Sequence, residues 1–136
     1  MIEELDDKQI DEFLRQQVIG RIGMHVHGET YVVPIIYAWD GKDIYVQSVE
    51  GRKIEMMRAN PEVCFETDWY ERGSWRSVIV DGTYEELHGV GAAKALALLV
   101  ARFAGSGGRR RPSSGGKQPV AFRIRPKRLT GRTVHR

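Results

Sequence analysis

The sequence predicts a mainly β protein of one domain, residues 1–136, built as a closed or nearly closed antiparallel barrel of six strands with a few helices. Six segments alternate apolar and polar residues with the two-residue period of a half-buried strand. The connections between them are short and carry Gly, Asp and Asn. The helical segments do not alternate regularly with the strands, so the βαβ pattern of a parallel sheet is absent. A chain of 136 residues is most simply one domain.

The six expected strands share this alternation and cover residues 20–26, 30–38, 44–49, 62–70, 75–87 and 120–124. Asp40-Gly41 is a strong hairpin signal between the second and third strands. Arg72-Gly73 links the fourth and fifth strands, and Asp81-Gly82 predicts a bulge that bends the fifth.

Three helices are expected around these strands. Asp6 or Asp7 can cap the first helix, which runs to about residue 17. The second covers residues 52–59 and ends at Asn60-Pro61, because the residue before a proline disfavours helical backbone. The third is the Ala- and Leu-rich segment 90–103.

The most informative stretch follows the third strand. Gln47 and Ser48 end that strand, Gly51 makes a turn, and Arg52 and Lys53 open the next helix. A helix N-terminus is already positive, so two cations there favour an anion between them. Free N–H groups, a hydroxyl and two basic side chains together predict a phosphate site. The alternative is that Arg52 and Lys53 point into solvent, as on many surface helices.

Pro34 lies in the middle of the second strand. Proline cannot donate a hydrogen bond to a neighbouring strand, so it belongs at an edge, at a bulge or beside something other than a strand. An inserted flat ligand or a dimer partner fits that position.

Charge is unevenly distributed along the chain. The formal net charge is +3, but residues 105–136 hold ten Lys or Arg and no Asp or Glu. This asymmetry predicts either an anionic ligand at that end or intramolecular ion pairs. The basic Gly/Ser/Arg segment 105–118 has the composition of a mobile loop and carries no aromatic residue on which bases could stack. Nucleic acid is therefore not favoured as a partner.

The remaining composition predicts a cytoplasmic protein without a membrane segment. No apolar run approaches the roughly 20 residues that span a bilayer, and the first residues are acidic, unlike a secretory leader. The single cysteine, Cys64, fits a reducing compartment and is expected to be a small buried hydrophobe. His25 and His27 could face one side of a strand, but no third ligand follows at a useful spacing, so no metal is expected.

Taken in order, these segments resemble the FMN-binding split-barrel family around pyridoxamine 5′-phosphate oxidase. The nearest branch is similar to the small proteins grouped with nitroimidazole-resistance reductases. The pieces that carry the resemblance are residues 20–23, 31–35, 44–48 with 51–53 and Asn60-Pro61, 75–78 with Gly82, and the closing segment 129–132. The resemblance covers residues 10–90 well and the last fifteen loosely.

The resemblance implies a six-stranded split barrel that forms a homodimer, with FMN in a groove between the subunits. Arg52 and Lys53 would hold the phosphate, residues 33–36 would lie along the isoalloxazine, and Ser77 would come from the neighbouring strand. The implied cofactor-binding residues are Val33, Pro34, Ile35, Ile36, Gln47, Ser48, Arg52, Lys53, Trp75 and Ser77.

The resemblance further implies a flavin-dependent oxidoreductase that acts on a small acceptor. Gln47 stands where the nitroimidazole-resistance branch typically has His, and Gln cannot change protonation near neutral pH. The substrate-phosphate residues of vitamin B6 oxidases are not found near the C-terminus, so that reaction is not expected. No residue is an obvious acid or base, and the catalytic residue stays unassigned. The alternatives are a deazaflavin- or haem-binding split barrel and a non-catalytic flavin carrier or sensor.

Overall fold

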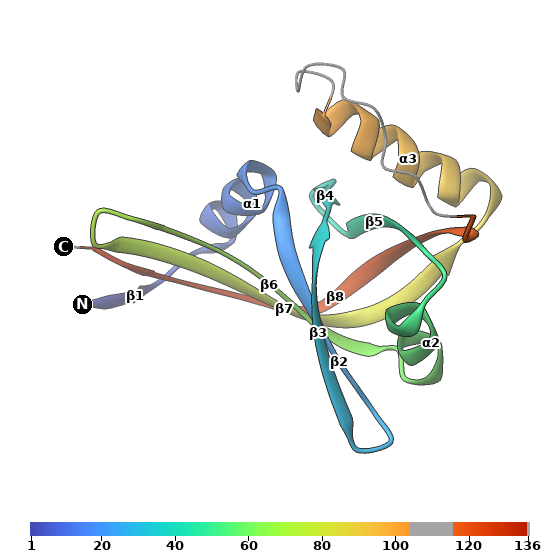
Figure 1. Cartoon of the computed structure of the whole chain (residues 1–136). Helices are drawn as coiled ribbons and strands as arrows, with labels where there is room; N and C mark the ends of the chain where they lie inside the picture. Colours follow the sequence, from blue (N-terminus) through green and yellow to red (C-terminus); the bar gives the residue numbers. More distant parts are fainter. Residues whose placement is uncertain (104–115, 136) are drawn as a thin grey trace.

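Eight antiparallel strands form one sheet in the order β3-β2-β6-β7-β8-β5-β4, and β1 pairs with β8 outside this path (Figure 1). The architecture is that of a computed structural model, which describes residues 1–103 and 116–135. The sheet curls without closing, because β3 and β4 end the strand order and do not pair with each other. This confirms the predicted mainly β split barrel.

The elements follow the chain in the order expected from the sequence. The strands are β1 (Ile2–Glu4), β2 (Ile19–Val26), β3 (Glu29–Ile36), β4 (Ala38–Trp39), β5 (Ile44–Val49), β6 (Glu62–Glu71), β7 (Ser74–Leu87) and β8 (Pro119–Val134). The helices are α1 (Asp7–Gln16), α2 (Arg52–Ala59) and α3 (Gly89–Phe103).

The core lies inside the curled sheet, where alternate residues of each strand point inward. Phe65, Phe122 and Tyr37 are fully buried, and the rings of Tyr37 and Phe65 meet edge to face at 4.9 Å. Helix α1 covers one end of this core with Phe13 and Leu14. Burial of each such side chain stabilises the fold by about 1.5–3 kcal/mol. The Tyr37 hydroxyl donates to the Leu14 carbonyl at 2.8 Å and so fixes α1 to the sheet.

Local signals in the sequence explain the ends of the elements. The Asp6 carboxylate accepts from the Gln9 backbone N–H at 2.8 Å, and the Gln9 side chain accepts from the Asp6 N–H in return. The register of β7 and β8 shifts between Asp81 and Gly82, which is the predicted bulge. A Cβ at Gly82 would lie 2.6 Å from the Arg125 carbonyl oxygen, so only glycine fits this bend.

The structure has more strand than the predicted six segments. Two short strands, β1 and β4, were not predicted, and β8 continues to Val134 instead of ending at residue 124. The extension of β8 beyond residue 124 was not predicted, because its basic residues are typical of a solvated tail. In the structure they pair with acids on neighbouring elements, and Thr133 and Gly131 of the same strand are buried.

The prediction that Cys64 is buried is wrong. Val63, Phe65 and Thr67 of β6 face the core, which places Cys64 on the outer, exposed side of the strand. A shift of one residue reverses the face of every side chain in a strand, and the apolar run around Cys64 did not fix that register.

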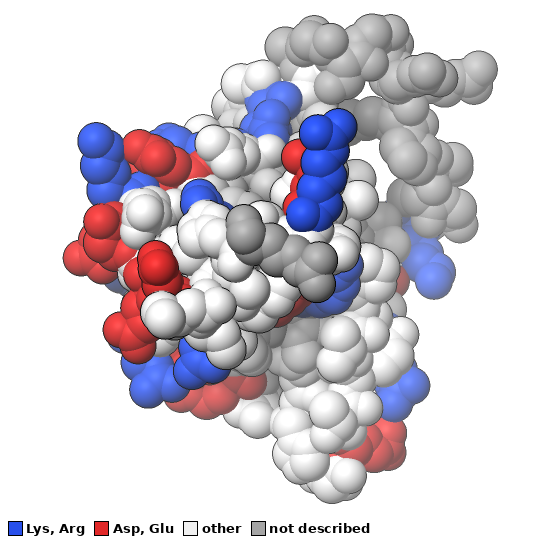
Figure 2. Space-filling view, turned by 90° about the vertical axis from the view of Figure 1, so that its left-hand side faces the viewer, with Lys and Arg blue, Asp and Glu red and all other residues white. Residues whose placement is uncertain are grey.

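Intramolecular ion pairs account for much of the basic C-terminal region. Arg123 and Arg125 pair with Glu85, Lys127 pairs with Glu62, and Arg128 pairs with Asp81. Figure 2 shows positive and negative side chains close together on the left-hand part of one face. The predicted mobile loop falls mostly on residues 104–115, outside the described residues. Of the three described helices, none has the length and apolar character needed to cross a membrane.

Candidate functional site

The opening of the barrel lies between the free edges of β3 and β5. Strand β3 is the end of the sheet, so Pro34 faces no further strand on its outer edge, as predicted. Strand β4 covers β5 only at Tyr45 and Ile44, which leaves the β5 edge beyond them open. Backbone groups on both edges can therefore hydrogen-bond to an inserted ligand.

The first turn of α2 lies next to this opening and is open to an anion. Gly51 is the N-cap residue, and no side chain of the described residues caps the helix. A Cβ at Gly51 would meet no atom of the described residues within 4 Å. The first N–H groups of α2 thus donate to no side-chain cap from these residues, and the positive end of the helix dipole favours an anion there.

Lys53 is the residue in this turn whose charge is least compensated. Its side chain is half-buried, and within residues 1–103 and 116–135 it forms no ion pair. Burial lowers the pKa of the Lys53 ammonium, and the nearby charge of Lys117 lowers it further. Two cations that approach each other without an acid are stabilised by an anion between them.

Arg52 is held differently from Lys53. Its guanidinium lies 4.2 Å from the centre of the Tyr31 ring and forms a 3.0 Å ion pair with Glu29. Both side chains of this pair are more than half exposed, so the pair is weak and can give way to a phosphate. Tyr31 and Glu29 belong to β3, so Arg52 joins the α2 turn to the β3 edge.

Gln47 and Ser48 lie on β5 beside the same turn. Their side chains alternate, with Ser48 half-buried and Gln47 exposed. Gln47 lines a cavity of ≈ 380 Å³ beneath α3, together with His88 and small side chains such as Ala92 and Ala121. On β3, Ile35 is buried and Val33 half-buried, whereas Pro34 and Ile36 are exposed.

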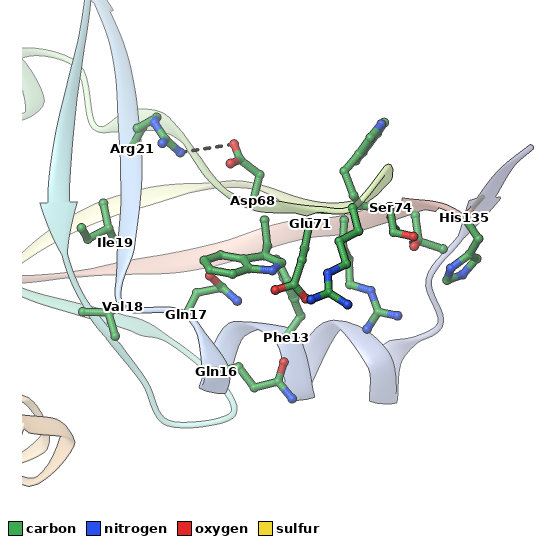
Figure 3. Close-up of a pocket in the computed structure, with 15 residues that line it drawn as sticks. Phe13, Gln16, Gln17, Val18, Ile19, Arg21, Asp68, Glu71, Ser74 and His135 are labelled. Carbon is green, nitrogen blue, oxygen red and sulfur yellow. Dashed lines mark hydrogen bonds and ion pairs between the residues drawn. The ribbon is translucent and has the colours of Figure 1, made fainter. Parts of the chain in front are cut away.

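Trp75 lies in a different and larger cavity, of ≈ 870 Å³, which Figure 3 shows between α1 and the β6–β7 hairpin. Phe13 and Gln17 of α1 form one wall. Trp69, Trp75 and Arg76 come from the hairpin. This cavity is lined by aromatic rings and guanidinium groups, whereas the α2 turn provides the N–H groups of a helix N-terminus.

Trp75 and Ser77 are far from Arg52 and Lys53 in one chain. Figure 1 shows the β6–β7 hairpin tip and α2 at opposite ends of the molecule. Glu86 of β7 hydrogen-bonds to Arg58 of α2, and Ser77 precedes Glu86 by nine residues. At about 3.3 Å per residue this is roughly 30 Å of strand. The predicted site residues therefore form two separate groups.

Between these groups the outer sheet face carries an acid pair that shares one cation. Arg21 Nη1 lies 2.9 Å from a Glu66 oxygen and 3.3 Å from an Asp68 oxygen. Burial raises the pKa of Glu66 to about 7, and the Asp68 carboxylate adds to this while Arg21 opposes it.

Two features of the site were not identified from the sequence. Lys117 approaches Lys53 because β8 pairs with β5, with Pro119 opposite Val49. Tyr31 stacks on Arg52 because β3 runs past α2. Both arrangements depend on long-range pairing, which no local motif reveals. Among the described residues, no group of three or more His, Cys, Asp or Glu could hold a metal ion.

Comparison with known proteins identifies the family. The sequence profile described as pyridoxamine 5′-phosphate oxidase matches residues 6–133. The chain belongs to the pyridoxamine 5′-phosphate oxidase family. An uncharacterized protein from Rhizobium meliloti is 37% identical over 70 residues, which is 51% of this chain and 46% of that protein. The match thus spans about half the length of this relative.

Two solved structures share the fold of this chain. An FAD-binding protein from Mesorhizobium loti has a TM-score of 0.85 and 30% identity, with 100% of this chain and 98% of that chain covered. A protein from Bacteroides thetaiotaomicron named for 5-nitroimidazole antibiotic resistance has a TM-score of 0.80 and 20% identity, with 98% and 87% covered. The predicted resemblance to the pyridoxamine 5′-phosphate oxidase family and its fold is confirmed.

Proposed function

We propose that this protein is a cytoplasmic, single-domain FMN-binding flavoprotein that acts as a homodimer and transfers hydride or electrons to a small acceptor. The cofactor would lie in the opening between β3 and β5 of one subunit, with its phosphate at the first turn of α2. The second subunit would cover the ring.

The observation that carries this proposal is the state of Lys53. A half-buried ammonium beside Lys117, with no acid bound to it in the described part of the chain, is an unfavourable arrangement without an anion. The uncapped α2 turn next to it supplies N–H groups that a phosphate can accept from. A phosphate dianion satisfies both features.

The two separate groups of predicted site residues support a dimer. One chain offers a phosphate turn at α2 and an aromatic cavity at the β6–β7 hairpin, roughly 30 Å of strand away. In a two-fold dimer each hairpin can approach the partner's opening, so each site would use both chains. The β2–β3 hairpin exposes Val32 along its length and Ile19 and Ile36 at its base, and so offers apolar surface for the contact.

The chain's own residues would bind and orient the cofactor. Lys53, Arg52 and the α2 N–H groups would hold the phosphate, Ser48 would bind near the ribityl chain, and the β3 edge would bind the ring through its backbone. When bound, FMN supplies the electron-accepting ring on which such oxidoreductases depend. Gln47 can orient a ligand by hydrogen bonds but exchanges no proton near neutral pH.

FAD is a second candidate cofactor, and a specific observation favours it. The 30% identical relative from Mesorhizobium loti is named an FAD-binding protein and aligns over the full length of this chain. The pair of Lys53 and Lys117 could also serve a diphosphate.

The absorbance spectrum of the purified protein is the first test, because oxidised flavin, deazaflavin and haem differ in the visible range. Titration with FMN, FAD and riboflavin then ranks the ligands, and FMN is expected to bind most tightly. NAD(P)H oxidation with and without quinone or nitro acceptors separates an oxidoreductase from a flavin carrier or sensor. A protein that binds no flavin at all would overturn the proposal.

A further inference from the structure

Arg58, in the last turn of α2, binds two carboxylates at once. Its Nη1 and Nη2 donate to the two oxygens of Glu50 at 2.8 and 2.7 Å. Its Nε and Nη2 donate to the two oxygens of Glu86 at 2.7 and 2.9 Å. Both bonds are thus bidentate, the strongest form of a charge-assisted hydrogen bond on a guanidinium.

Glu50 is the acid that directly precedes the candidate phosphate turn, whereas Glu55 lies within the first turn of α2. Glu50 immediately precedes Gly51, the N-cap of α2, and its backbone N–H donates to the Gln118 carbonyl at 2.9 Å. Gln118 follows Lys117, so this bond places the Glu50 backbone beside the segment that carries Lys117. A free carboxylate here would compete with a phosphate for the same cations.

The direction of side chains on a helix explains how Arg58 reaches Glu50. Long helical side chains point toward the N-terminus of the helix, and α2 has eight residues, or about 12 Å of axis. The Arg58 guanidinium, in the last turn, therefore extends back along α2 toward Glu50, which precedes the N-cap residue of the helix. Glu86 fixes the same guanidinium to β7, and the Tyr84 hydroxyl donates to Glu86 at 2.8 Å.

The position of these bonds argues against a role in stability alone. The side chains of Arg58 and Glu50 are 42% and 38% exposed, so solvent screens part of what even this bidentate pair contributes to folding. Because the four hydrogen bonds of Arg58 lie beside the candidate anion site, they can also keep the negative charge of Glu50 away from a bound anion.

We propose that Arg58 is a positioning residue for flavin binding: it holds the Glu50 carboxylate away from the Lys53 turn, so that this turn is available to the flavin phosphate. The inference rests on the proposed function. It assigns to Arg58 an effect on phosphate-bearing ligands only, since riboflavin has no group for Glu50 to compete with.

The test compares FMN and riboflavin affinity in Arg58→Met, Glu50→Gln and the double variant, with Arg15→Met as control. Arg15 is likewise an exposed arginine on a helix that binds a carboxylate, Asp11, away from α2. Arg58→Met is expected to weaken FMN binding about tenfold, as for the loss of about one hydrogen bond to a charged group. Riboflavin binding should change less than about twofold, and Arg15→Met should leave both affinities unchanged.

Glu50→Gln distinguishes this role from a general loss of structure. Gln at position 50 carries no negative charge that could compete with the phosphate, whether or not Arg58 is present. Glu50→Gln alone and the double variant should therefore bind FMN within about threefold of the wild type. Equal losses of FMN and riboflavin, unchanged FMN binding in Arg58→Met, or no recovery in the double variant would each overturn the inference. Wild-type protein that binds neither flavin would overturn the proposed function and this inference with it.

Discussion

The two ends of the barrel differ in what they offer a flavin. The α2 end has an uncapped helix turn and the half-buried Lys53, which suit a phosphate. The β6–β7 end has Trp69 and Trp75 around a large cavity, which suit a planar ring. Within the part of the chain that the structure describes, neither end has both features. Under the proposed function, a complete site would therefore combine the α2 end of one copy with the hairpin end of another.

This comparison makes a specific distinction between variants. Changes at the α2 end should affect ligands that carry a phosphate and spare those that do not. Changes at the hairpin end should affect every flavin, because all of them carry the same ring.

The largest effect is expected from Arg52→Ala with Lys53→Ala. Hydrogen bonds to charged groups contribute about 1.5–3 kcal/mol each, so the double change should weaken FMN binding by at least a hundredfold. Riboflavin affinity should change little. Fluorescence titration with FMN and with riboflavin measures the two affinities. Equal losses of affinity for both ligands would show that the phosphate does not bind at this turn.

A smaller effect is expected from Trp75→Ala. Loss of an aromatic contact with the ring should weaken FMN and riboflavin binding alike, by about tenfold. Tyr70→Ala is the matched control, since Tyr70 lies at the same hairpin tip, is exposed and does not line the cavity. A loss confined to FMN, or the same loss in the Tyr70 variant, would contradict the assignment of Trp75 to the ring.

A moderate pH effect is expected from Glu66, whose pKa is raised to about 7 from an ordinary value of 4.5 by burial and by Asp68. Between these values the folded state binds more protons than the unfolded state, so this group lowers the free energy of unfolding as the pH rises. The loss is complete above about pH 7. Glu66→Gln should therefore gain stability relative to the wild type as the pH rises from about 4.5 to about 8.

Thermal unfolding at several pH values measures this gain. Glu12→Gln, which changes an exposed carboxylate on α1, is the control and should follow the wild type. A difference between Glu66→Gln and the wild type that stays constant over this pH range would show that Glu66 titrates normally.

The smallest effect is expected from Lys127→Met. Lys127 and Glu62 form a pair whose side chains are both more than half exposed, so its loss should lower the free energy of unfolding by less than about 1 kcal/mol. FMN affinity should not change, because a compensated cation on β8 has no role in the site. A marked loss of FMN binding would mean that positive charge in general, and not Lys53 in particular, attracts the cofactor.

Local sequence signals predicted most of the fold. The alternation of β2, β3 and β5–β7, the Asp81-Gly82 bulge and the bounds of α2 all follow from patterns within a few residues. The continuation of β8 was missed because its charges are neutralised by acids that lie far away in sequence. The outward face of Cys64 was missed because strand register depends on pairing partners.

The candidate site could be predicted only in part. The Gly51-Arg52-Lys53 turn is a local motif, and the structure places it at the barrel opening. The approach of Lys117 and the separation of Trp75 from Lys53 arise from strand order, which no short motif encodes. The arrangement of two chains lies beyond what alternation and spacing can determine.

The most direct test of a site shared between two copies is subunit complementation. The Arg52→Ala/Lys53→Ala and Trp75→Ala proteins are mixed in equal amounts, allowed to exchange subunits, and titrated with FMN. Random pairing makes half of the dimers mixed, and each mixed dimer has one site with every native residue, so about a quarter of the sites should regain wild-type affinity. If sedimentation shows mixed dimers and no tight FMN site appears, each site is built from a single chain and the account is wrong.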